Sequence, residues 1–267
     1  MVNMGTKRLA LIASTAMLSA LMWWVSHRWL GTEGRFSDWQ LFLWPFIAII
    51  IVGAISGLAL LLLQSRWDRL AVTLSAWATL PIFFTPNIWY LSILPVFAFF
   101  WLDASRRMQR EASERHKFRI RGILGAGVRL ILLGIFLMTS LGFYLTPVGS
   151  AVNVETITRG IQNSLDDTYD SALVRGQLAD LPPSLQSQFR RDLAQAVEEN
   201  AQRWLGPISP ALPPLFALAL FLGLWGVMVF VREPTLWVAT GLFTLMRRTG
   251  FVTVTEEQVP KEVVSLS

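Results

Sequence analysis

Twenty-three consecutive residues without a charge, LFLWPFIAIIIVGAISGLALLLL at 41–63, set the class of this protein. The hydrocarbon core of a bilayer is about 30 Å thick, and a helix of about 20 apolar residues crosses it. This run therefore predicts a transmembrane helix, with enough length for some tilt.

The composition of the whole chain agrees with this prediction. Of the 267 residues, 53% are apolar and 15% are charged, whereas soluble domains carry roughly a quarter charged residues. The 12 tryptophans fit a membrane interface, which the amphipathic indole ring prefers. The apolar content argues against disorder, and the absence of cysteine excludes disulfides and cysteine metal sites.

Five further apolar runs bring the expected number of membrane spans to six: 9–25, 70–84, 88–102, 130–146 and 214–231. Lys7 and Arg8 precede the first run, as in a signal peptide. That run ends in bulky Trp23 and Trp24 instead of a small-residue cleavage site, so we expect an uncleaved signal-anchor helix.

Two parts of this map allow alternatives. The runs 70–84 and 88–102 have only 15 residues each, so they either cross thinly or dip into the membrane as a re-entrant pair. The apolar stretch 236–246 is short and ends in Arg247 and Arg248. We expect it to lie on the interface, with a seventh span over 235–246 as the alternative.

The distribution of basic residues predicts the orientation, because positively charged loops resist translocation. With the N-terminus inside, 15 of the 23 lysines and arginines fall on the inner side, seven of them in a basic loop at 103–122. We therefore expect both termini in the cytoplasm. The lack of cysteine and of external glycosylation sequons is compatible with a prokaryotic plasma membrane.

Tryptophan positions provide a second test of the orientation. In this topology, interface tryptophans fall at both ends of the spans. The outer ones are Trp23, Trp24, Trp39 and Trp89, and the inner ones are Trp67 and Trp101.

Residues 148–210 form the only long polar stretch, and their apolar side chains recur at three- and four-residue steps. From the expected N-cap Asn153, one helix runs toward Gly176, and a second follows Pro183 and ends before Gly206. We expect an extracytoplasmic two-helix hairpin. So small a unit buries little surface, so the hairpin over 153–205 rests on the membrane domain, pairs with a second copy or binds another protein.

Residues suited to catalysis are missing from the predicted spans, which contain no Asp, Glu, His or Lys. Proton relays and intramembrane hydrolases depend on such residues. His27 and His116 fall in loops on opposite sides and cannot share a metal. Phosphate-binding loops, HExxH and GxSxG are absent. We expect no enzyme, no cofactor and no metal.

The basic residues near the cytoplasmic face are candidates for contact with anionic lipid headgroups, because each contributes about 1 kcal/mol near a negative surface. These candidates are Arg106, Arg107, Arg110, Arg115, Lys117, Arg119, Arg121 and Arg129. Arg129 is expected to snorkel from its helix toward the interface. Nucleic acid is disfavoured as a partner, since no aromatic stacking platform accompanies these charges.

Glycines suggest where helices approach closely. Gly53 and Gly57 form a GxxxG motif in the second run, which favours packing against a neighbouring helix within the chain or against a second copy. Gly122, Gly125 and Gly127 are expected to mark an irregular start of the fifth run.

The sequence therefore predicts an all-α, polytopic membrane protein. Its parts are a membrane domain over 1–147, the hairpin over 148–210, a last span with the interfacial segment over 211–248, and a tail over 249–267. The tail is either a disordered terminus or an extended peptide that adds to a partner's sheet. A non-catalytic scaffold or assembly factor is the expected function, and a channel or transporter component for a neutral solute, lined by 70–102, is the alternative.

Overall fold

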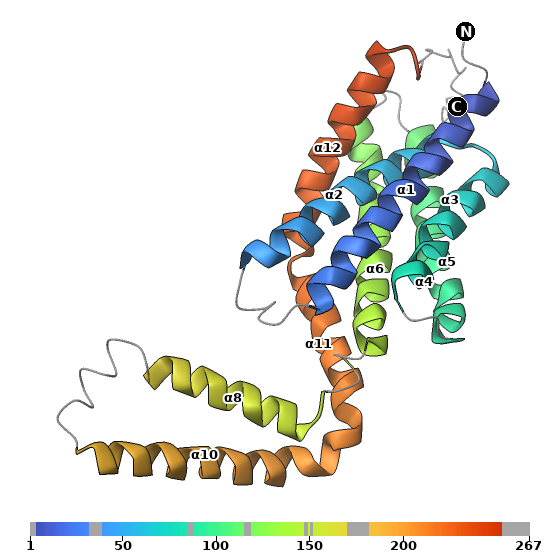
Figure 1. Ribbon diagram of the computed structural model, residues 1–267. Coiled ribbons are helices and arrows are strands. Elements are labelled where there is room, and N and C mark those ends of the chain that lie inside the picture. Colours follow the sequence, from blue (N-terminus) through green and yellow to red (C-terminus); the bar gives the residue numbers. More distant parts are fainter. Residues whose placement is uncertain are drawn as a thin grey trace, which may run out of the picture.

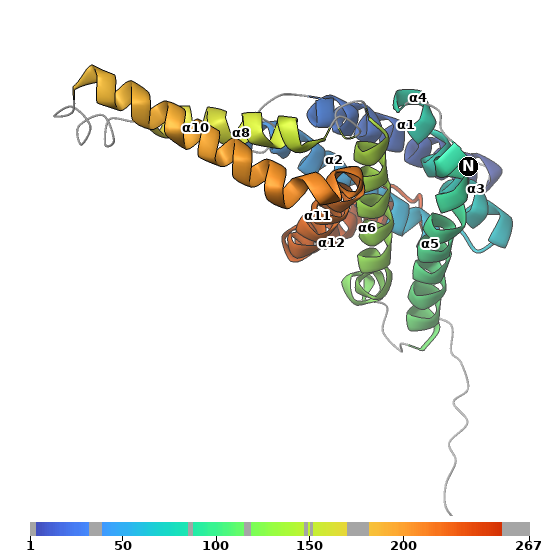
Figure 2. The ribbon, with the colours of Figure 1, turned by 90° about the horizontal axis from the view of Figure 1, so that it is seen from below.

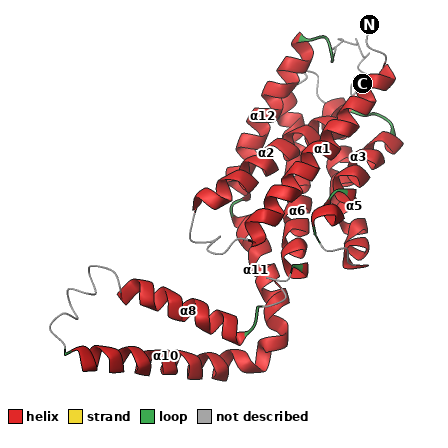
Figure 3. Cartoon of the chain, viewed as in Figure 1, coloured by secondary structure: helices red, strands yellow, loops and turns green. Residues whose placement is uncertain are grey.

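The computed structural model describes residues 4–31, 39–84, 88–114, 119–146, 149, 152–169 and 182–252. Every element within these ranges is helical, as Figure 3 shows, so the predicted all-α class is confirmed. Four stretches of helix are long and apolar enough to cross a membrane, namely Gly5–Gly31, Phe42–Leu62, Ile120–Leu145 and Arg191–Gly226. These lengths and compositions indicate a membrane protein.

The helices form a bundle and an arm (Figure 1). The bundle contains α1 (Met4–Gly31), α2 (Trp39–Leu62), α3 (Arg66–Ala78), α4 (Leu80–Phe83), α5 (Ile88–Glu114), α6 (Ile120–Leu145), α11 (Leu212–Gly226) and α12 (Met228–Arg248). The arm contains α8 (Val154–Tyr169) and α10 (Pro183–Leu205), and the 3₁₀ helix η1 (Gly206–Ala211) joins it to α11. Figure 2 shows the arm extending to one side of the bundle.

The two ends of the bundle differ in charge. The start of α1 and the end of α12 lie together at the end farthest from the arm (Figure 1). We call this the basic end, because Lys7 and Arg8 lie near the start of α1, Arg247 and Arg248 end α12, and Arg8 pairs with Asp68 next to Arg69, and we call the opposite one the arm end. Lys7 Nζ donates to the carbonyl oxygens of Gly250 and Phe251, at 3.1 and 2.9 Å.

Helix α6 forms the centre of the bundle, and it contacts α2, α5, α11 and α12. Its glycines allow close approach. A Cβ atom at Gly127 would lie 2.7 Å from the Ala104 carbonyl oxygen, and one at Gly134 would lie 2.9 Å from Trp101 Nε1. Real Cβ atoms essentially never come this near, so a side chain at either position would force α5 atoms to shift. Such small residues let helix backbones pack tightly in a membrane.

The GxxxG glycines of α2 also lie against neighbouring helices. A Cβ at Gly53 would lie 3.2 Å from Leu132 of α6 and 3.2 Å from Thr235 of α12, whereas one at Gly57 would make ordinary contacts of 3.6 Å with Leu124 and Val128. Gly53 therefore faces two helices of the same chain.

The run 70–84 is divided between α3 and α4, with a break at Thr79. Pro81 has no N–H and cannot continue the helical hydrogen-bond ladder. The Ala76 carbonyl oxygen near this break accepts a hydrogen bond from Trp23 Nε1 of α1 at 3.0 Å and another from Thr79 Oγ1 at 2.9 Å. A carbonyl group next to the break thus gains a hydrogen bond from a side chain of another helix.

The predicted basic loop 103–122 is mostly helical, which corrects the expectation. Helix α5 continues to Glu114, and α6 begins at Ile120. One face of this extension packs into the bundle, with Ala104 and Met108 fully buried. The exposed face carries i,i+4 ion pairs, Arg107 with Asp103 at 2.9 Å and Arg110 with Glu114 at 2.7 Å, which stabilise a solvated helix.

The expected irregular start of the fifth run is wrong for the same reason. Gly122, Gly125 and Gly127 all lie inside α6. Gly127 serves the close contact with α5 described above, so its role is packing.

The last two helices divide the chain differently from the prediction. The run 214–231 is split at Val227 into α11 and α12, and the stretch 236–246 is part of α12. Helix α12 packs against α2 and α6, and its buried face includes Thr235, Leu236, Ala239 and Phe243. Because these residues recur at three- and four-residue steps, α12 buries one side in the bundle.

Two of the tryptophans expected at the interface are buried inside the bundle. Trp23 is 1% exposed and Trp101 is fully buried. Each fills space beside a small residue, Ala76 or Gly134. Trp67, in contrast, is 79% exposed. The side chains of Trp39 and Trp89 lie outside what the structure describes.

The arm is held together by a small apolar contact. Val154 of α8, Ala201 of α10 and Leu212 of α11 are buried together. The predicted N-cap is confirmed, since Asn153 Oδ1 accepts the Thr156 N–H at 2.8 Å and Thr156 Oγ1 accepts the Asn153 N–H at 2.9 Å. This reciprocal pair resembles a capping box and fixes the start of α8.

The glycine contact of α6 yields a stability prediction. Gly127→Ala would place its methyl group against the Ala104 backbone and Met108, so we expect a loss of about 1–3 kcal/mol from overpacking. Gly241→Ala is the matched control, because nothing lies within 4 Å of a Cβ there, and alanine favours a helix. Thermal unfolding in detergent measures both, and an unchanged midpoint for Gly127→Ala would contradict the close packing.

Candidate anion site at the basic end

The predicted lipid-contacting residues do not form one cluster. Arg106, Arg107 and Arg110 are exposed on α5, Arg119 and Arg121 are exposed around the start of α6, and Arg129 is exposed farther along α6. Arg115 and Lys117 lie outside the described residues. Among the described ones, Arg107 and Arg110 face their own ion-pair partners, whereas Arg106 lines a pocket between α3 and α5.

The pocket is also lined by Arg69, which the positive-inside pattern does not single out. Arg69 is only 9% exposed, although it carries a full charge. Its Nη1 donates to Ser105 Oγ at 3.2 Å and to Gln109 Oε1 at 2.7 Å. Its Nε donates to the Ser65 carbonyl at 3.3 Å, and its Nη2 to the Gln64 carbonyl at 3.4 Å. These bonds hold the guanidinium group in one orientation.

The same side chains connect three helices. Ser105 Oγ, which accepts from Arg69 of α3, donates to the Leu60 carbonyl of α2 at 3.0 Å. Gln109 Nε2 donates to the Leu63 carbonyl just after α2 at 3.4 Å. Arg69 therefore joins α3 to a polar contact between α5 and α2, and the pocket wall cannot shift without breaking these bonds.

The pocket has a volume of about 360 Å³ and is lined by Arg66, Arg69, Leu70, Leu102, Arg106 and Gln109. Three arginines thus surround one space. Burial, and next the positive charges of Arg66 and Arg106, lower the pKa of Arg69 from its ordinary value. Arginine stays charged even so, so the pocket is a fixed concentration of positive charge.

Two carboxylates next to this pocket in the sequence pair with other arginines. Asp68, next to Arg69 in α3, pairs with Arg8 of α1 at 3.6 Å. Asp103 of α5 pairs with Arg107. Within the described ranges, Arg66, Arg69 and Arg106 form no ion pair, so their combined charge is available to an anion.

A second pocket at this end of the bundle is already neutralised in part. It measures about 430 Å³ and lies between α6 and α12, with Arg119, Arg121, Arg232 and Glu233 in its lining. Glu233 pairs with Arg121 at 2.7 Å and with Arg232 at 2.9 Å. The Arg121 guanidinium also lies 4.8 Å from the centre of the Trp237 ring. Most of the cationic groups here are satisfied within the protein.

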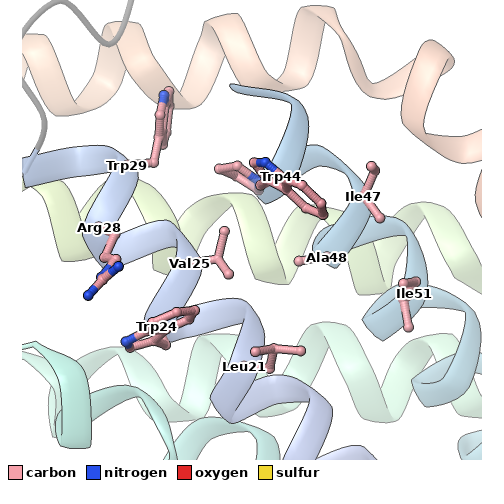
Figure 4. A pocket seen from close by; sticks show the side chains of 10 residues that line it. Leu21, Trp24, Val25, Arg28, Trp29, Trp44, Ile47, Ala48 and Ile51 are labelled. Carbon is pink, nitrogen blue, oxygen red and sulfur yellow. The ribbon is translucent and has the colours of Figure 1, made fainter. Parts of the chain in front are cut away.

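An apolar groove lies between α1 and α2 toward the arm end (Figure 4). It measures about 590 Å³, and its lining includes Leu21, Trp24, Trp44, Ile47 and Ile51. The Arg28 guanidinium lies 4.7 Å from the Trp24 ring, as a cation–π pair. Its lining suits a hydrocarbon chain and offers no acid–base pair.

The chemistry-bearing residues are sparse. Within the described ranges, no group of three or more His, Asp or Glu is close enough to hold a metal ion. His27 packs edge-on against Phe84 at 5.2 Å between ring centres, and His116 lies outside the described residues. No family model, no curated protein and no solved structure matches the chain.

The role of Arg69 predicts a loss of stability when its side chain is truncated. Arg69→Ala would leave Ser105 and Gln109 without their buried donor, and we expect destabilisation of roughly 2–3 kcal/mol. Arg69→Lys should restore stability only in part, because an ammonium cannot reproduce the planar fork. Thermal unfolding in detergent tests this series.

The matched control is Arg107→Ala, which removes an exposed i,i+4 pair on α5 and should cost no more than about 0.5 kcal/mol. Equal losses of stability for Arg69→Ala and Arg107→Ala would show that the hydrogen bonds of Arg69 stabilise the fold no more than an exposed ion pair does.

Proposed function

We propose that the chain is a multi-pass protein of the cell membrane with six crossings, both termini in the cytoplasm and a non-catalytic scaffold or assembly role. The basic end is its cytoplasmic face, and the arm lies outside. Support for the orientation comes from the charge difference between the two ends, because basic residues remain on the cytoplasmic side.

The packing of α3 and α4 supports a full membrane crossing by this segment rather than a re-entrant pair. Arg69 near the start of α3 bonds Ser105 and Gln109 at the basic end. Phe84, just after α4, lies against His27 in the last third of α1 and against Gly142 near the end of α6. The α3–α4 segment thus runs most of the length of both neighbours, and α5, with 27 residues, returns.

The arm is the observation that carries the scaffold proposal. It projects from the bundle (Figures 1 and 2) and leaves large apolar side chains exposed, among them Ile161 of α8, Leu185 and Trp204 of α10, and Ile208 of η1. Trp204 is 73% exposed. Tryptophan is enriched among the residues that anchor protein interfaces, so we propose that the arm binds a second copy or another protein through Trp204.

The alternative, a path for a neutral solute lined by 70–102, gains no support from an observation. Pro95 lies inside α5, which continues as a helix through it, and the side chain is exposed on the bundle surface. It lines none of the three pockets described above.

The topology can be tested with single cysteines, because the chain has none of its own. Ser113→Cys at the end of α5 and Gln202→Cys on α10 are both at exposed positions. A membrane-impermeant maleimide should label Gln202→Cys in intact spheroplasts and should label Ser113→Cys only after permeabilisation. The reverse pattern would overturn the orientation.

The interaction role predicts position-specific crosslinking. A photoreactive p-benzoylphenylalanine in place of Trp204 should give a discrete protein adduct in native membranes, of about twice the monomer mass if the partner is a second copy. The same group in place of Glu199, which is exposed and lies about 140° around α10 from Trp204, should give little. Equal adducts at both positions, or none at Trp204, would contradict a partner surface on the arm.

A further inference from the structure

The pocket between α3 and α5 has the features of a phosphate site. Arg69 lines it, is the buried arginine of the three and is held by four hydrogen bonds, all to neutral groups. Burying a cation without a counter-charge is unfavourable, and hydrogen bonds offset only part of that cost. An anion in the pocket would supply the missing charge.

We propose that this pocket binds a phosphate group, carried by an anionic lipid of the cytoplasmic leaflet or by free phosphate. Arginine suits this ligand because its planar guanidinium forms paired hydrogen bonds with phosphate oxygens. Only the lipid source rests on the membrane placement proposed above; binding of the phosphate group itself does not.

The donors available to the phosphate come from three side chains. One N–H of Arg69 Nη2 has no acceptor among the described residues, since the other donates to the Gln64 carbonyl. Arg66 and Arg106 are exposed, line the same pocket and form no ion pair within the described ranges. The fixed Arg69 would set the position of the phosphate, and the exposed Arg66 and Arg106 would add further donors.

The apolar part of the lining favours a lipid as the source. Leu70 and Leu102 are half-buried and form the side of the pocket next to the apolar lengths of α3 and α5. Trp67, one residue after Arg66, is largely exposed, as an interface tryptophan would be. The pocket is large enough for a headgroup, and acyl chains would lie on the bundle surface beyond the two leucines.

The pocket between α6 and α12 makes a useful contrast. It also contains arginines, but Glu233 lies between Arg121 and Arg232 and pairs with both. A phosphate there would have to displace a carboxylate. The α3–α5 pocket has no such competitor among the described residues, which is why we assign the site to it.

The test uses the full chain, purified in detergent, and measures thermal stabilisation and bound lipid by native mass spectrometry. The probes are dioleoylphosphatidylglycerol, dioleoylphosphatidylcholine and inorganic phosphate. The variant Arg66→Gln/Arg106→Gln removes two exposed charges and leaves Arg69 in place. The control Arg107→Gln/Arg110→Gln removes the same charge from the same helix region outside the pocket.

We expect phosphatidylglycerol to bind the wild-type chain more tightly than phosphatidylcholine, and the Arg66→Gln/Arg106→Gln variant to lose at least about tenfold in this affinity. The control should stay within about threefold. Stabilisation by inorganic phosphate that competes with the lipid would identify the free anion as a ligand of the same site. If neither phosphatidylglycerol nor inorganic phosphate binds, or if variant and control lose the same affinity, the proposed site is wrong.

The cysteine labelling in spheroplasts separates this proposal from the topology. If the Ser113 and Gln202 labelling patterns hold while the lipid effect fails, the membrane placement stands and the phosphate site is wrong. If labelling is reversed while inorganic phosphate still binds, the site stands and the cytoplasmic leaflet is excluded as its lipid source.

Discussion

The bundle depends on how closely α5 and α6 approach. In lipid, apolar side chains gain little by leaving their surroundings, so helices associate through van der Waals packing and interhelical hydrogen bonds. Gly127 and Gly134 remove the side chains that would hold α5 away from α6, and Met108 and Trp101 occupy the space. With α5 in place, α6 presents its other faces to α2, α11 and α12, and the polar contacts at the basic end come within reach.

The apolar pattern of the sequence predicts the helices that lipid surrounds, but not how the helices contact one another. In a bilayer a long uncharged run such as 41–63 satisfies its backbone hydrogen bonds as a helix, and the structure has a helix there. Helix α12 was divided wrongly because Arg232 and Glu233 interrupt its apolar pattern. They are accommodated by pairing with each other and with Arg121 of α6, a contact between residues more than a hundred positions apart. Residue type alone predicts Trp23 and Trp101 at the interface, whereas in the bundle Trp23 bonds the Ala76 carbonyl and Trp101 packs beside Gly134.

The candidate site was predictable only as a region. The positive-inside count drew attention to the arginines of 103–122, and Arg106 does line the pocket. This count cannot distinguish Arg106 from its neighbour Arg107. Arg106 lines the pocket, whereas Arg107 pairs with Asp103. Arg69 was missed because its partners, Ser105 and Gln109, are neutral and 36 and 40 residues away. The only signal in the sequence is the i,i+4 spacing of Ser105 and Gln109, within a part of α5 that is otherwise rich in charged residues.

The contact between Lys7 and the turn after α12 brings the start of α1 close to the end of α12. Gly250, at φ +70°, turns the chain after α12, and the Phe251 N–H bonds back to the Met246 carbonyl at 2.9 Å, as in a Schellman motif. This turn brings the carbonyls of Gly250 and Phe251 onto Lys7 of α1. The start of the first helix and the turn after the last are therefore close in space, so a short peptide joining residue 252 to residue 5 would close the backbone into a ring. In such a ring the chain could be opened between α5 and α6, and every helix would keep the same neighbours.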